Sequence, residues 1–356
     1  MPPSGVARPP AIAADALAGQ AQTFLKSPEL YAFLQANYAF YVAHDYARVL
    51  ALLPDASHLP AYTPLAFSAQ VLRGQALARR NDRNEAGFWR DLLHGANAPW
   101  QAETVQLGLA LQQERHGHLA DVFAPGSAVT DPDLRTILIT HAAGPDLLRH
   151  LADGHAANAD EAHLALYVLL YKALTRGDYA RFLAVRPLLS GVPVPPPPKP
   201  EDYRVLAPTP TVFATGKTGD GYPCPALTAT AGVLSANPAD PHALLCLGDF
   251  LRLNGLDGVQ DPDRRPDPEV LGGGANDYAG KPIGRGRYYA TVIADPRAAA
   301  ADKAYALYRS VMCFAPSGYD AGCQSDLSKP QRKALFLRLK HDYPTSPWAQ
   351  KLKYYW

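Results

Sequence analysis

Acidic and histidine side chains are the first residues of this chain that could do chemistry. Glu114, His116 and His118 lie within QERHGHLAD, and two histidines beside a carboxylate could bind a metal ion if the backbone were extended. The stretch is also typical of a helix end, where His and Arg complement the negative pole of the helix dipole. His155 and His163 lack a recognisable third ligand. We therefore expect helix capping and no metal site.

A group of aspartates in the Gly/Pro/Asp-rich segment 255–286 is the second candidate. Calcium prefers such oxygen ligands, but the prolines and arginines between them interrupt the ligand register, so we expect a solvated loop. A glycan-processing or other hydrolase is the alternative function, with its site framed by this segment. The aspartates of the possible calcium loop are Asp257, Asp261, Asp263 and Asp267, and the candidate carboxylates of the hydrolase are Asp257, Asp263 and Asp277.

Two further patterns match known catalytic motifs only in part. Gly216-Lys217-Thr218 is similar to the end of a phosphate-binding loop, but residue 211 is Thr where that loop requires glycine. Ser317 lies in APSGYD, without the Gly-x-Ser-x-Gly frame of a nucleophile elbow. We therefore expect neither a catalytic residue nor a bound cofactor.

The four cysteines indicate disulfides. Cys313 and Cys323 flank the loop FAPSGYDAG, and closing a loop of about ten residues should stabilise the fold by on the order of 2–3 kcal/mol. For Cys224 and Cys246, a second bridge and two free thiols are about equally favoured, because Cys246 lies in the buried pattern ALLCLGDFL. No C-x-x-C pair is present, which argues against a zinc or thioredoxin-like site. Disulfides would place the chain in an oxidising compartment.

The composition excludes some classes of partner. Net charge is +1 with both signs scattered, so the basic stripe of a nucleic-acid-binding protein is missing. No apolar run approaches the roughly 20 residues that cross a bilayer. Residues 1–14 contain no recognisable signal peptide, so we expect either a cytosolic chain or a processed or truncated piece of an exported one.

Helical periodicity dominates both halves of the chain. Alanine and leucine are abundant while valine and isoleucine are scarce, which favours helices over sheets. Apolar residues recur at helical spacing and the connections are short, as in antiparallel helix pairs. The expected helices are Tyr38–Leu53, Pro64–Arg80, Glu85–His94, Trp100–His116, Asp131–His141, Pro145–Ala152, Asp160–Arg176, Asp178–Leu189, Pro225–Asn237, Pro241–Leu253, Gly286–Ala294, Ala300–Phe314, Lys329–Tyr343 and Ser346–Tyr355.

The fold class expected from this pattern is all-α. The pairs recur at roughly the 34-residue spacing of tetratricopeptide repeats, which favours an α-solenoid over the alternative of a compact helical bundle. The run VPVPPPPKP favours an extended path and marks a boundary. We predict an N-terminal helical repeat region at 1–191, a Pro-rich linker or strap at 192–218, and a C-terminal helical repeat region at 219–356.

The C-terminus combines a helix, a Tyr-Pro-Thr-Ser turn and a second helix start, followed by three large aromatic residues. ADKAYALYRSVMCFAPSGYDAGC and RKALFLRLKHDYPTSPWAQKLKYYW, about the last seventy residues, resemble the C-terminus of uncharacterised proteobacterial periplasmic tetratricopeptide-like proteins, loosely described as outer-membrane-assembly-lipoprotein-like. The resemblance implies an α-solenoid in the periplasm with a partner-binding role, and no catalytic residue.

The leading hypothesis is a non-enzymatic periplasmic scaffold that binds a protein partner in the cell envelope. A related hypothesis is an accessory subunit of a larger envelope complex, which would dock through Tyr354, Tyr355 and Trp356. Tyrosine and tryptophan are enriched at the centres of protein interfaces. Trp348, in contrast, is expected to lie in the core.

Overall fold

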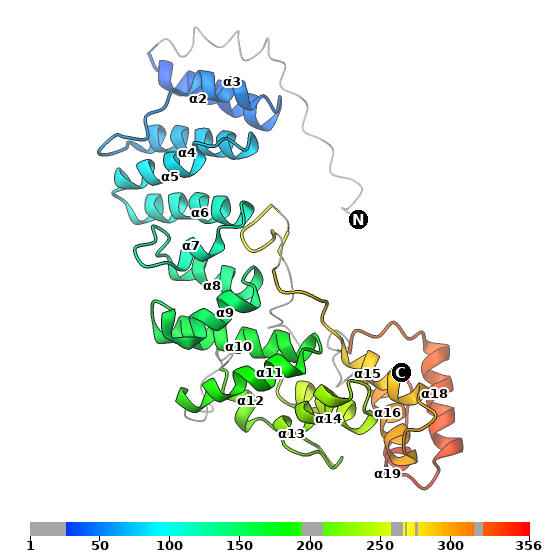
Figure 1. Ribbon diagram of the computed structural model, residues 1–356. Coiled ribbons are helices and arrows are strands. Elements are labelled where there is room, and N and C mark those ends of the chain that lie inside the picture. The colour runs from blue at the N-terminus through cyan, green and yellow to red at the C-terminus, as the bar shows by residue number, and fades with distance from the viewer. Residues whose placement is uncertain (1–25, 194–208, 258–265, 268, 275–276, 317–322) are drawn as a thin grey trace, which may run out of the picture. The chain divides into compact units, whose positions relative to one another are not determined.

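The computed structural model describes residues 26–193, 209–257, 266–267, 269–274, 277–316 and 323–356. Every regular element in these ranges is a helix and none is a strand (Figure 1), so the prediction of an all-α chain is confirmed for them. None of the helices in the same ranges has the length and apolar character needed to cross a membrane.

The chain divides into two compact units. Unit 1 comprises Met1–Arg135 and Glu269–Gly274, and unit 2 comprises Thr136–Pro268 and Ala275–Trp356. A short segment from the second half of the sequence therefore belongs to the first unit. The predicted linker at 192–218 falls largely on residues 194–208, outside the described ranges, so that division stays a prediction.

Unit 1 is a stack of helices in which each packs against the next along the chain (Figure 1). Helix α4 also contacts α2 on one side and α6 on the other, so these three form one layer, with α3 and α5 behind them. The helices are α2 (Pro28–Tyr41), α3 (Tyr46–Leu52), α4 (Pro64–Arg79), α5 (Glu85–His94), α6 (Pro99–Arg115) and α7 (Leu119–Phe123), and α8 (Pro132–His141) spans the boundary with unit 2.

Local capping explains where many of these helices begin. The Thr63 side chain accepts a hydrogen bond from the backbone N–H of Ala66, and Pro64 occupies the first turn of α4, where a missing N–H costs nothing. Asp45 caps α3 in the same way by accepting from the N–H of Arg48. These side chains satisfy backbone donors that the helix itself leaves unpaired.

The predicted helix Tyr38–Leu53 is wrong, because the structure places a helix end and a new start inside it. Helix α2 ends at Tyr41, and α3 begins only after the cap at Asp45. His44 between them has φ +53°, a left-handed conformation that ends a helix, and Asp45 N–H donates to the Ala39 carbonyl. The turn folds α3 back onto α2 and makes the first helix pair.

Trp89 fixes the spacing between three helices of unit 1. Its ring comes from α5 and occupies the space that a Cβ would need at Gly74 of α4 and at Gly108 of α6. The indole N–H donates to Glu85, and Glu85 is paired with Arg115 at 2.6 Å. Glycine at both positions therefore lets a large ring fill the interior of the stack.

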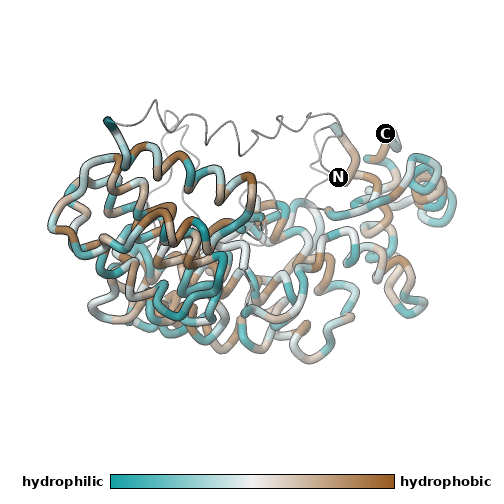
Figure 2. The backbone as a smooth tube through the Cα atoms, turned by 90° about the horizontal axis from the view of Figure 1, so that it is seen from above, coloured by the Kyte–Doolittle hydropathy of each residue, from teal (hydrophilic) through white to brown (hydrophobic). Residues whose placement is uncertain are grey.

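Unit 2 is centred on α10, whose residues from Ala165 to Thr175 are all buried. The chain then continues through α11, α13, α14, α15, α16 and α18, each in contact with the next. In both units apolar and polar stretches alternate along the backbone tube (Figure 2), as expected for helices that bury one side. The helical elements of this unit are α9 (Pro145–His150), the π-helical turn Leu151–His155, α10 (Ala159–Thr175), α11 (Tyr179–Val185), the 3-10 helix Arg186–Gly191, α12 (Val212–Thr215), α13 (Leu227–Ala236), α14 (Pro241–Leu253), α15 (Arg285–Ala294), α16 (Ala300–Met312), α18 (Lys329–Asp342) and α19 (Pro347–Lys351).

Two predicted features of unit 2 have clear outcomes. Both disulfides form, Cys313–Cys323 and Cys224–Cys246, so the prediction of the first bridge is confirmed and the open question about the second is resolved. The final helix is shorter than predicted, because α19 ends at Lys351 and Leu352 is already extended. The disulfides agree with folding in an oxidising compartment.

Candidate functional site

A buried tyrosine joins a histidine and an aspartate in unit 2. The Tyr222 hydroxyl donates to Asp302 Oδ1 at 2.6 Å and lies 2.9 Å from His242 Nδ1. Since that hydroxyl proton is directed to Asp302, we assign the proton of the second contact to Nδ1, so His242 donates to the Tyr222 oxygen. His242 comes from the first turn of α14 and Asp302 from the first turn of α16, so the tyrosine connects the starts of two helices.

Aromatic rings enclose this polar group. The Tyr222 ring stacks on Tyr305 with centroids 4.0 Å apart, and Trp348 lies against Tyr305 at 4.5 Å. Burial raises the pKa of Tyr222, and its hydrogen bond to Asp302 acts in the same direction. Tyr305 donates to Asp249 at 2.6 Å, and burial raises its pKa as well. Both hydroxyls are therefore protonated donors to carboxylates at neutral pH.

The remaining nitrogen of His242 faces the disulfide. Nε2 lies 3.6 Å from Cys246 Sγ, one helical turn further along α14, and Cys246 is bonded to Cys224. A histidine with a carboxylate behind it could act as a base, but the sulfur beside it is oxidised and is not a nucleophile. Within the described ranges, no group of three or more His, Cys, Asp or Glu side chains could hold a metal ion. The arrangement therefore supports a structural role, in which Tyr222, His242 and Asp302 hold α14 and α16 to the loop that contains Tyr222. We call these three residues the Tyr222 bracket.

The carboxylates of the hydrolase alternative have separate partners. Asp257 forms an ion pair with the buried Arg285. Asp277 packs its Cβ close to Gly144, where an added Cβ would lie 2.8 Å away. Asp263 lies outside the described residues. The two described carboxylates therefore have structural neighbours of their own, and the hydrolase stays an untested alternative.

Glu114 has a role that the sequence did not predict. Its two carboxylate oxygens accept backbone N–H groups from Gly272 at 2.9 Å and Gly274 at 3.0 Å. The expected helix end is present, since α6 stops at Arg115 and the backbone N–H of His116 caps it by donating to Gln112. No local pattern could have indicated the contact with residues 158 and 160 positions away.

Two other histidines named in the sequence analysis have local contacts. His118 precedes α7 as its N-cap. His155 stacks on His150 with centroids 4.1 Å apart and contacts the His150 carbonyl. The His118 side chain makes no capping hydrogen bond to α7.

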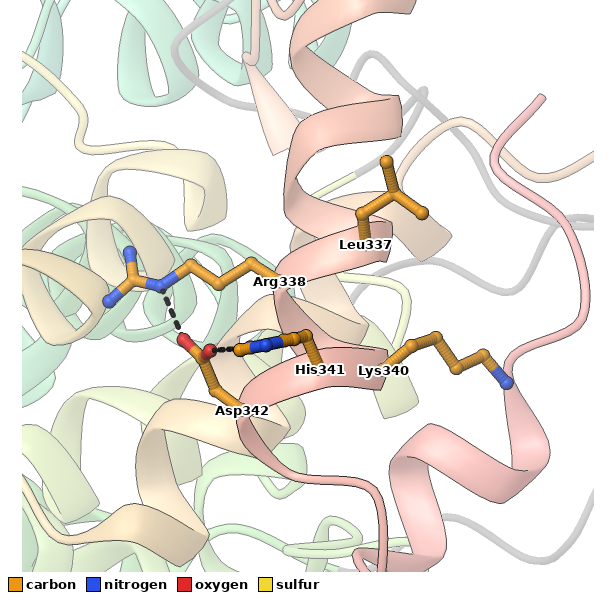
Figure 3. Close-up of a pocket in the computed structure, with 5 residues that line it drawn as sticks. All are labelled: Leu337, Arg338, Lys340, His341 and Asp342. Atoms are coloured by element: carbon orange, nitrogen blue, oxygen red, sulfur yellow. Dashed lines mark hydrogen bonds and ion pairs between the residues drawn. The ribbon is translucent and has the colours of Figure 1, made fainter.

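A shallow hollow on α18 is the surface depression shown in Figure 3. Its lining residues all come from a single turn and a half of this helix: Leu337, Arg338, Lys340, His341 and Asp342. Arg338 and His341 both point to the Asp342 carboxylate, whereas Lys340 points away from them and donates to the Ala349 carbonyl (Figure 3). Charges that neutralise one another on one exposed helix do not form an enclosed site.

The C-terminal aromatic residues lie beside α18. Tyr355 packs against Phe336 with centroids 5.6 Å apart, and Tyr354 packs against Trp356 at 6.2 Å. Tyr354 remains 66% exposed. Trp348, in contrast, is buried against Tyr305 and Tyr308, as expected for a core residue. Partner binding by Tyr354, Tyr355 and Trp356 stays a prediction.

Helix α6 of unit 1 carries two exposed apolar side chains. On α6, Trp100 is 48% exposed and Leu107 is 37% exposed. They are seven residues apart and therefore lie on one face.

Comparisons with known proteins identify no relative. A scan against protein-family models finds no match for this chain, and searches of curated proteins and of solved structures find none either.

Proposed function

We propose that this chain is a non-enzymatic protein-binding scaffold of the cell envelope, built from tetratricopeptide-like helix pairs. The observation that carries the proposal is the layer formed by α2, α4 and α6, with α3 and α5 packed behind it. Such layers offer an extended surface for another protein instead of a pocket for a small substrate. The periplasm is the compartment that fits two disulfides in an envelope scaffold.

The two exposed apolar side chains of α6 support a protein partner. Trp100 is held in place by an edge-to-face contact with Phe67, with centroids 5.0 Å apart, yet half of its surface is available. A rigid, half-exposed tryptophan is the type of residue that dominates binding energy at protein interfaces. Leu107 extends the same face by two helical turns.

Site-specific photocrosslinking in the native cell tests the scaffold proposal. A benzophenone side chain at position 107 should give one discrete adduct, and Trp100→Ala should reduce that adduct several-fold by weakening binding. Position 233 on α13 is the matched control, since Val233 is comparably exposed at 44% but lies in unit 2. Position 107 giving no adduct above the position 233 control would contradict the proposal.

An accessory-subunit role would use the C-terminal residues instead. Crosslinking from position 354 then gives the dominant adduct, because Tyr354 is the most exposed of the three aromatics there. The two versions of the scaffold hypothesis are thus separated by which position reacts.

A further inference from the structure

The segment Glu269–Gly274 lies on unit 1 as a bound peptide would. It contacts the C-terminal ends of two neighbouring helices of the α2–α4–α6 layer, through Arg79 of α4 and Glu114 of α6. Leu271 between these anchor points is only 6% exposed. The segment thus makes an ion pair, buries one apolar side chain and donates two backbone N–H groups.

The geometry also selects for glycine. A Cβ at Gly274 would lie 2.8 Å from the Glu114 carboxylate oxygen and 3.1 Å from its carbon, so any larger residue would displace the acceptor. Gly272 has φ +82°, a conformation that other residues rarely adopt. With Gly272 in this conformation, the N–H groups of Gly272 and Gly274 both donate to the Glu114 carboxylate.

The three contacts differ in importance. The Arg79–Glu269 pair is 3.1 Å long, but both side chains are about half exposed or more, so solvent screens it. The two hydrogen bonds to Glu114 involve a charged acceptor, which makes them stronger than neutral ones. Affinity should therefore depend more on the glycine amides than on the acidic residue, and burial of the leucine should add to it.

We propose that the ends of α4 and α6 form a peptide-binding site for segments of the type acidic-x-Leu-Gly-x-Gly, occupied in this chain by its own residues 269–274. The site names the class of partner segment for the scaffold function proposed above, on which it rests. The internal copy competes with a partner through its high effective concentration, so a partner segment binds only when the internal one is released.

The test uses the full chain and a fluorescein-labelled peptide, DPEVLGGGAN, which copies residues 267–276. Leu271→Asp in the chain places a charge at the buried position and should release the internal segment. We expect this variant to bind the peptide at least ten-fold more tightly than wild type by fluorescence anisotropy. A peptide with valine in place of the last glycine should not bind, and Glu114→Gln added to the variant should weaken binding at least ten-fold.

A second release variant, Gly274→Val, keeps Leu271 and places a side chain against the Glu114 carboxylate. Circular dichroism should show native helix content for both variants. Folded release variants that do not bind the peptide would overturn the proposal. Loss of folding in both variants would also overturn it, since the segment would then be part of the core and not a ligand. A persistent crosslink from position 107 in either case would leave the scaffold function standing.

Discussion

The Tyr222 hydroxyl connects three parts of unit 2 that are distant in the sequence. It contacts His242 of α14 at 2.9 Å and Asp302 of α16 at 2.6 Å, while its ring stacks on Tyr305. A buried hydroxyl with two partners costs more to remove than its own net contribution, because both partners are left unsatisfied. The bracket is therefore expected to stabilise the fold, whatever unit 2 binds.

Tyr222→Phe should lower the free energy of unfolding by about 1–3 kcal/mol, because it removes the hydroxyl and keeps the stacked ring. Urea denaturation followed by circular dichroism measures the change. The control Tyr354→Phe alters a 66% exposed ring and should shift stability by less than about 0.5 kcal/mol. Equal effects of the two substitutions would show that the hydroxyl bracket contributes nothing.

The raised pKa of Tyr179 predicts that the folded chain loses stability at alkaline pH. Burial raises the pKa of Tyr179 to about 12, against about 10 in an unfolded chain. Above pH ~10 the unfolded chain therefore loses this proton while the folded chain retains it. The stability that the group contributes is complete below pH ~10 and is lost as the pH rises toward about 12.

The difference between wild type and Tyr179→Phe isolates this contribution. Urea titrations at pH 8 and pH 11 should show wild type losing more stability than the variant, since phenylalanine has no proton to lose. If both proteins lose the same free energy of unfolding between pH 8 and pH 11, then Tyr179 has the same pKa in the folded and unfolded chain.

At the scale of helices, Trp89 makes the packing of α4, α5 and α6 sensitive to one methyl group. A Cβ at Gly108 would lie 2.7 Å from the Trp89 ring, so Gly108→Ala should cost about 1–3 kcal/mol through overpacking. Gly87→Ala is the matched control on α5, where an added Cβ meets nothing within 4 Å. That substitution should stabilise by about 0.5–1 kcal/mol through helix propensity.

Thermal unfolding of the two glycine variants checks this pair of predictions. The melting temperature should fall for Gly108→Ala and rise for Gly87→Ala. A rise for both would mean that the Trp89 ring moves aside without cost and that helix propensity alone determines the change in melting temperature.

Helix bounds were predictable where the signals are local. Pro64, Glu85 and Pro241 each open a helix at the expected residue, because prolines and acidic residues at helix starts act within one turn. The break between Tyr41 and Tyr46 was missed, since apolar periodicity continues across it and His44 carries no strong turn signal. The Cys313–Cys323 disulfide was predictable from the short spacing of the two cysteines.

The contacts made over long sequence distances were not predictable. Glu114 appeared in the sequence as part of a helix end, and the glycines of residues 272–274 as part of a loop. They meet because residues 269–274 belong to unit 1, although in the sequence they follow residues 136–268 of unit 2. The Tyr222, His242 and Asp302 group has the same origin, since Tyr222 and Asp302 are 80 positions apart.

At the scale of the whole molecule, the two units differ in covalent support. Both disulfides lie in unit 2, and unit 1 contains no cysteine. Their sequence separations of 22 and 10 residues correspond to about 3 kcal/mol each from restriction of the unfolded chain. Reduction should therefore weaken unit 2 and leave unit 1 unchanged if the units unfold independently.

Pulsed hydrogen exchange with peptide-level mass spectrometry, along a urea gradient with and without reductant, distinguishes the units. Reductant should lower the unfolding midpoint of peptides from 209–257 and 277–356, while peptides from 28–130 keep theirs. Peptides covering 269–274 should follow unit 1, because this segment belongs to that unit and Glu114 of α6 accepts two of its backbone N–H groups. A common shift in every peptide would show that the chain unfolds as one cooperative body, because stabilisation by a local crosslink is then shared by all of it.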